Sequence, residues 1–132
     1  MRRRDQRRAA IFAVYQHEVT GTPVAELLGE DATPWSHSLA EATISNLENL
    51  DALIDKHASG WDISRIAPLD KAILRVAVLE ITHPSASGYG TPIPPEGAID
   101  EAVQTAKEFC STDAPGFVNG ILAAVLDERR EP

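Results

Sequence analysis

The 132-residue sequence predicts an all-α fold, with about seven helices in a single domain spanning residues 1–132. Two observations carry this prediction. Apolar residues recur every three or four positions in most segments between glycine and proline signals, which is the period of an amphipathic helix. No segment of convincing length alternates apolar and polar residues as a half-buried strand does. A chain of this length buries about two thirds of its unfolded surface, enough for a core without disulfides.

The first predicted helix runs from Gln6 to Val19 and has a strongly basic start. Thr20-Gly21 supplies its stop signal. Arginines in the first turn oppose the helix macrodipole, at a cost of about a few tenths of a kcal/mol each. We therefore expect them to have a role other than helix stability. The apolar residues on one side of this helix are Ile11, Phe12, Tyr15 and Val19.

Two threonine–proline pairs predict the next helix starts, because threonine caps helix N-termini and proline suits the first helical position. Thr22-Pro23 opens a short helix that Gly29 ends. Thr33-Pro34 opens a longer stretch that Ser59-Gly60 closes, with a break expected near residues 49–51.

The most apolar helix is predicted at residues 69–82, after Pro68 and a connector at 61–65. Its composition leaves little polar surface, so we expect it to be central. Arg75 and Glu80 lie inside this run. Since a buried charge is costly unless it is paired, we expect both to have structural partners.

Residues 83–95 are rich in proline, serine and glycine and predict a surface loop. Two amphipathic helices follow, one at 99–110 and, after a turn, one at 117–126. Gly120 lies inside the last helix, where glycine costs about 1 kcal/mol relative to alanine. We interpret it as the site of a close helix crossing.

The charge distribution is uneven. The chain has a net charge of −8, yet five of its twelve basic residues and only Asp5 among the acidic ones lie in residues 1–8. This arm therefore carries +4 and the remainder carries −12. A short basic arm on an acidic body indicates either contact with a polyanion at one end or a solvated tail.

Nothing in the sequence predicts catalysis, a cofactor or a metal site. The four histidines are scattered, Gly88-Tyr89-Gly90 is too short to cradle a phosphate, and the neighbouring Asp100 and Glu101 point in different directions on a helix. Cys110 is the single cysteine and is expected to pack as a small apolar residue. There is no signal peptide and no apolar run of roughly 20 residues, so we expect a cytoplasmic protein.

RNA recognition remains as a hypothesis. The arginines at positions 3, 4, 7 and 8 can present guanidinium groups to successive phosphates, and Tyr15 and Phe117 are candidates for base stacking, although core packing is an alternative for each ring. With three to five such contacts, a plot of the logarithm of the RNA-binding constant against the logarithm of the salt concentration has a slope of only about −2 to −3.5 for single-stranded RNA. We call this the salt slope. We therefore expect a second component to complete the binding surface.

Three motifs in order resemble the NusB family of transcription antitermination factors across nearly the whole chain. They are the segment from Arg2 to Gln16, the run from Gly60 to Ala77 that contains Pro-Leu-Asp-Lys-Ala-Ile-Leu-Arg, and the pair formed by 98–107 and Phe-Val-Asn-Gly at 117–120. Gly116 departs from the family pattern, in which a basic residue often precedes Phe-Val-Asn-Gly.

The resemblance implies two small helical bundles, no enzymatic activity, and binding of boxA RNA in ribosomal RNA transcripts together with NusE, a ribosomal protein of the small subunit. Other Nus factors and RNA polymerase would join in a larger complex, and either a monomer or a homodimer is allowed. Asp70 would contact NusE. The residues implied at the RNA face, with Arg8 added from the arm, are Arg3, Arg4, Arg7, Arg8, Tyr15, Asp113 and Phe117.

Two alternatives remain from the sequence. RNA cytosine methyltransferases carry a similar helical module at their N-terminus, but no glycine-rich cofactor motif follows here before Pro132. The other alternative is a protein-binding scaffold without RNA contact, in which the arginine arm is a solvated tail.

Overall fold

The structure is a computed structural model that describes residues 2–88 and 90–131. Met1 in the predicted arm, Tyr89 in the predicted loop and Pro132 lie outside the described residues. Within them the chain forms seven α-helices, one short 3-10 helix and no strand, which confirms the all-α prediction. The elements are α1 (Arg3–Thr20), α2 (Val24–Leu28), α3 (Pro34–Ser45), α4 (Leu47–His57), η1 (Ile63–Arg65), α5 (Pro68–Thr82), α6 (Pro95–Phe109) and α7 (Ala114–Arg130).

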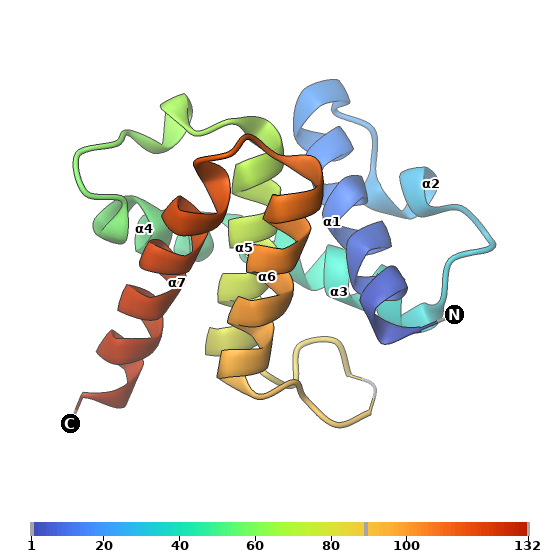
Figure 1. Cartoon of the computed structure of the whole chain (residues 1–132). Helices are drawn as coiled ribbons and strands as arrows, with labels where there is room; N and C mark the ends of the chain where they lie inside the picture. Colours follow the sequence, from blue (N-terminus) through green and yellow to red (C-terminus); the bar gives the residue numbers. More distant parts are fainter. Residues whose placement is uncertain (1, 89, 132) are drawn as a thin grey trace.

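The helices form two small bundles that meet at α5 (Figure 1). Helices α1, α2 and α3 pack on one another, and α4, α6 and α7 pack around α5. Every residue from Ala72 to Ile81 on α5 is buried, and α5 also contacts α1 and α3. The apolar run in the sequence therefore becomes the shared centre of the core, as predicted.

Arg75 joins three helices, which confirms the structural partner predicted for it. On α5 it donates to both carboxylate oxygens of Asp51 on α4, at 2.7 and 2.8 Å, and to Glu18 on α1 at 3.3 Å. Burial alone would lower the pKa of Arg75, but the hydrogen bonds to Asp51 and the two nearby carboxylates raise it. The guanidinium thus stays charged and holds the two bundles together.

Three local predictions need correction. Thr22 does not cap the short helix, because α2 begins at Val24 with Pro23 in the N-cap position and no side-chain cap. The break expected near 49–51 lies earlier, at Asn46, where the side-chain amide donates to the carbonyl of Ala42 at 2.7 Å. A side-chain hydrogen bond of this kind competes with the backbone hydrogen bonds of the helix. The periodicity of the apolar residues carries no signal of such a bond.

The prediction of a close helix crossing at Gly120 is wrong. The residue is exposed, and a Cβ atom built on it would meet nothing within 4 Å. Gly116, one turn earlier, is equally open. Both glycines line a surface hollow beside α7, so their small size leaves space at the surface instead of admitting a neighbouring helix.

Candidate nucleic-acid interface

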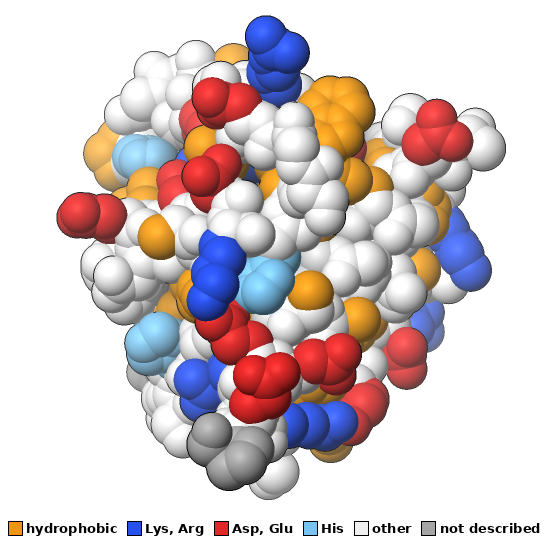
Figure 2. All heavy atoms as spheres, turned by 90° about the vertical axis from the view of Figure 1, so that its left-hand side faces the viewer, with side chains coloured by type: hydrophobic (Ala, Val, Ile, Leu, Met, Phe, Trp, Pro, Cys, Tyr) orange, Lys and Arg blue, Asp and Glu red, His pale blue; other side chains and the backbone are white. Residues whose placement is uncertain are grey.

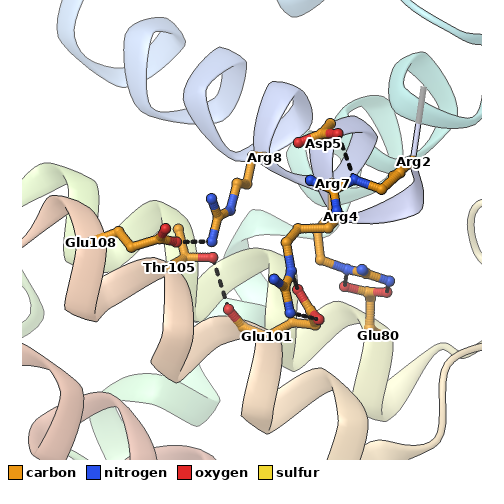
Figure 3. A network of polar contacts seen from close by, with 9 residues as sticks. All are labelled: Arg2, Arg4, Asp5, Arg7, Arg8, Glu80, Glu101, Thr105 and Glu108. Carbon is orange, nitrogen blue, oxygen red and sulfur yellow. Dashed lines mark hydrogen bonds and ion pairs between the residues drawn. The ribbon is translucent and has the colours of Figure 1, made fainter.

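The arginines of α1 reach across to carboxylates on α5 and α6 (Figure 3). Arg4 donates two hydrogen bonds of 3.0 Å to the two oxygens of Glu101 on α6. The hydrogen bond to Arg4 lowers the pKa of Glu101, and the same bond raises the pKa of Arg4. Arg8, one turn further, makes an ion pair with Glu108 on the same helix. Arg4 and Arg8, one turn apart on α1, thus pair with two carboxylates that lie about two turns apart on the same side of α6, along one seam between the helices.

Arg7 points to the other side, into the core. Its Nε and Nη2 donate to the two carboxylate oxygens of Glu80 on α5 at 2.8 and 2.9 Å, and the two residues are only 6% and 8% exposed. The partner predicted for Glu80 is thus confirmed. Removing one member of a buried pair typically costs about 3–5 kcal/mol, because a charge is left without compensation. Arg7 therefore anchors α1 to the central helix.

Among the arginines of α1, Arg3 has the fewest charged partners in the described residues. Its guanidinium stacks on the ring of Trp35 at 4.3 Å and donates to Gln6 at 3.1 Å, but it makes no ion pair with a described residue. Together with Arg4 and the loop between α5 and α6, it lines a hollow of about 370 Å³. Among residues 3–8, Arg3 thus has the guanidinium most available to an anion.

An aromatic pair continues the seam between α1 and α6. Phe12 and Phe109 meet edge to face at 5.2 Å, and Arg8 lies over the Phe109 ring at 5.4 Å. Phe109 is 48% exposed, and neither phenylalanine was among the sequence candidates. Helical spacing places Phe12 one turn from Arg8, but only the three-dimensional packing brings Phe109 against both.

Three of the remaining candidate residues lie together beyond the Phe109 end of the seam, and the fourth, Tyr15, lies apart from them on α1. Asp113 is exposed at the start of α7, Phe117 is half-buried in its first turn, and Asp70 lies in the first turn of α5. These three line one hollow of about 310 Å³, so the expected NusE contact and part of the expected RNA face adjoin. Tyr15 is half-buried against the core from α1.

Cys110 adjoins this hollow through its hydrogen bond to Asp70. Burial, and then its hydrogen bond to Asp70, raise the pKa of the thiol to about 12. It packs against the core, as predicted. In the part of the chain that the structure describes, no three His, Cys, Asp or Glu side chains gather to hold a metal ion. Nor is any described helix long and apolar enough to cross a membrane.

Comparison with known proteins identifies the family. The sequence model of the NusB family matches residues 4–127. The chain belongs to the NusB family. The transcription antitermination protein NusB of Rubrobacter xylanophilus is 34% identical over 134 residues, which cover 97% of this chain and 92% of the relative. Family membership makes the chain a homologue of an antitermination factor and not an enzyme.

Solved NusB structures have the same fold. NusB of T. maritima superposes with a TM-score of 0.84 at 28% identity, covering 97% of this chain and 92% of that one. A chain from a crystal structure of antitermination factors NusB and NusE in complex with dsRNA gives a TM-score of 0.80 at 23% identity, covering 96% of each chain. The two-bundle arrangement is therefore the NusB fold.

Proposed function

We propose that this chain is a transcription antitermination factor that binds the boxA element of ribosomal RNA transcripts as a heterodimer with NusE. The observation that carries the proposal is the match to the NusB family over residues 4–127, together with the antitermination protein that is 34% identical to the chain. The shared fold with a NusB chain solved alongside NusE and dsRNA supports both classes of partner. Other Nus factors and RNA polymerase would complete the assembly in the cytoplasm.

The geometry supports a composite RNA surface along the seam between α1 and α6. In this proposal Arg3, Arg4 and Arg8 contact phosphates from α1, and Tyr15 adds a ring. Asp113 and Phe117 contribute at the start of α7. The guanidinium of Arg7 is bound to Glu80, so in this proposal Arg7 positions the RNA-binding face of α1 and does not itself contact RNA.

Asp70 is the proposed NusE contact, because it is the acidic residue before Lys-Ala-Ile-Leu-Arg in the motif shared with the NusB family; it lines the hollow that also holds Asp113 and Phe117. Asp70→Lys should weaken the heterodimer, measured by titration of NusE without RNA. Because Asp70 also bonds Cys110, the variant Asp70→Asn serves as a control that keeps the side-chain shape. An unaltered dissociation constant for Asp70→Lys would place this residue outside the interface.

The proposed function is tested by titrating labelled boxA RNA with and without NusE. We expect NusE to tighten binding and a scrambled RNA of the same length to bind more weakly, because phosphate contacts alone carry no sequence information. Equal binding of both RNAs would remove the claim of specificity. Binding of NusE with no RNA affinity at all would leave a protein-binding scaffold. Light scattering on the isolated chain distinguishes a monomer from a homodimer.

A further inference from the structure

Trp61 is a large aromatic side chain left at the surface. It lies in the connector between α4 and η1 and is 54% exposed. The indole meets Phe117 of α7 edge to face, with ring centroids 6.1 Å apart and an interplanar angle of 69°. Since an edge-to-face contact covers little of the flat faces, the indole keeps a face that a further planar group can cover.

Two hollows flank this aromatic pair. One, of about 310 Å³, includes Arg65, Asp113 and, at its α5 side, the proposed NusE contact Asp70; the other, of about 390 Å³, includes Gly116 and Gly120. Trp61 and Phe117 line both, so the pair forms a ridge between them. The volumes fall at the lower end of the range of about 300–1,000 Å³ seen for small-molecule sites. Figure 2 shows the face of α4 and α7, where apolar side chains reach the surface among scattered charges.

Arg65, beside the ridge, makes no ion pair with a carboxylate of residues 2–88 or 90–131. Eight of the twelve lysines and arginines, all of them described, make ion pairs. The four that do not are Arg3, Arg65, Lys107 and Arg129. Asp62, three residues earlier, accepts hydrogen bonds from the backbone nitrogen and hydroxyl of Ser64 at 2.9 and 2.8 Å; these bonds, and to a smaller extent the nearby charge of Arg65, lower the pKa of Asp62, but no ion pair forms with Arg65. Arg65 is therefore available to an external anion.

We propose that Trp61 stacks on a base of the bound single-stranded RNA and that Arg65 contacts a phosphate beside it. This inference rests on the proposed function and adds two residues to the RNA face. It extends the path of the RNA from Phe117 across the ridge, away from the arginines of α1.

The open indole face and the nearby Arg65 favour single-stranded RNA as the occupant, although the acidic body repels a polyanion. Outside the basic arm the chain carries a net charge of −12, which repels the phosphates of RNA. Contact through the flat faces of bases is therefore less costly here than contact through several phosphates. Base stacking on aromatic rings is tolerant of sequence and stabilises single-stranded complexes strongly. Asp113, in the same hollow, can accept a hydrogen bond from a base amino group, a contact that carboxylates make with cytosine.

The test measures labelled boxA RNA by fluorescence anisotropy at saturating NusE. Trp61→Ala should weaken RNA binding by about 5- to 150-fold, the range for loss of one stacked base, while Trp61→Phe should keep most of the affinity. Arg65→Gln should make the salt slope shallower by about 0.7. Val19→Ala is the matched control, since Val19 is 58% exposed and lines neither hollow, and it should bind as the parent protein does.

A second readout follows the indole itself. The chain has two tryptophans, and Trp35 is only 7% exposed. RNA should quench the fluorescence of the parent protein, and Trp61→Phe should abolish most of that quenching. Thermal melts of the variants check that they remain folded.

Three results separate the possibilities. Unchanged RNA affinity in Trp61→Ala overturns the stacking contact while the proposed function stands. A weaker complex with NusE in the absence of RNA overturns it too, because the ridge would then dock a protein. Failure of the parent protein to bind boxA RNA with NusE contradicts the proposed function first, and the inference falls with it.

Discussion

Replacing Arg7 by methionine should destabilise the fold more than any other single change in the basic arm. The substitution keeps a long side chain but leaves Glu80 buried without its two hydrogen bonds of 2.8 and 2.9 Å. A loss of about 3–5 kcal/mol is expected for breaking a buried pair. With an unfolding entropy of about 2.1 cal/mol/K per residue, a chain of 132 residues loses about 11–18 °C of Tm.

The assay is thermal and urea unfolding followed by circular dichroism, in a double-mutant cycle with Glu80→Met. The double variant Arg7→Met/Glu80→Met removes both charges and should recover most of the stability, since buried pairs are often replaceable by apolar residues. Arg4→Met is the matched control, because Arg4 makes the same two-bond contact with Glu101 in an exposed position. It should change Tm far less, as exposed ion pairs contribute little.

The same variants decide what Arg7 does for RNA. If Arg7 only positions α1, the stable double variant should bind boxA RNA with NusE as the parent protein does. A double variant that is stable but no longer binds RNA would show direct contact. A loss below about 1 kcal/mol for Arg7→Met alone would refute the anchoring role, since removing a compensated buried charge cannot cost so little.

Three further predictions follow from single positions. Gly120→Ala should raise stability by about 0.5–1 kcal/mol in urea unfolding, because the site is helical and open, and a loss would mean that the position is crowded. Gly116→Lys should tighten RNA binding and steepen the salt slope by about 0.7; an unchanged slope would place Gly116 away from phosphates. The raised pKa of Cys110, about 12, means that the folded state holds the thiol proton more firmly than the unfolded state, so this contribution is complete below about pH 9 and declines as the pH rises toward 12. Alkylation of the native thiol at pH 8 should accordingly be much slower than in urea, and equal rates would contradict the protected thiol.

The helices were predictable because their signals are local. Thr33 accepts a hydrogen bond from the backbone nitrogen of Ser36 at 3.2 Å, with Pro34 at the first helical position, as the threonine–proline pair predicts. The burial of 72–81 follows in the same way from an apolar run with almost no polar face. Gly120 was misinterpreted because a glycine in a helix has the same sequence signal whether it faces a helix or open solvent.

The partners of the arginines could not be predicted, because they lie far away in the chain. Arg4 and Glu101 are 97 residues apart, and Arg7 and Glu80 are 73 apart. The sequence showed that helix stability alone does not account for arginines in the first turn of α1. It did not show that carboxylates on α5 and α6 hold them. The sequence gives no signal at Trp61 and Arg65 for a related reason, since the hollows beside them exist only once α7 lies against the connector.

The ion pairs of α1 limit how much the arm can gain from a polyanion. A phosphate that reaches Arg4 or Arg8 must displace Glu101 or Glu108, and the released carboxylate then lies close to the phosphate and repels it. Counting each arginine as one full phosphate contact therefore overestimates the electrostatic attraction. If only Arg3 and Arg65 are free to contact phosphates, the salt slope of binding to single-stranded RNA should be shallower than about −2. Stable binding then depends on stacked bases and on NusE, and a slope near −3.5 would instead mean that the arm arginines leave their carboxylates on binding.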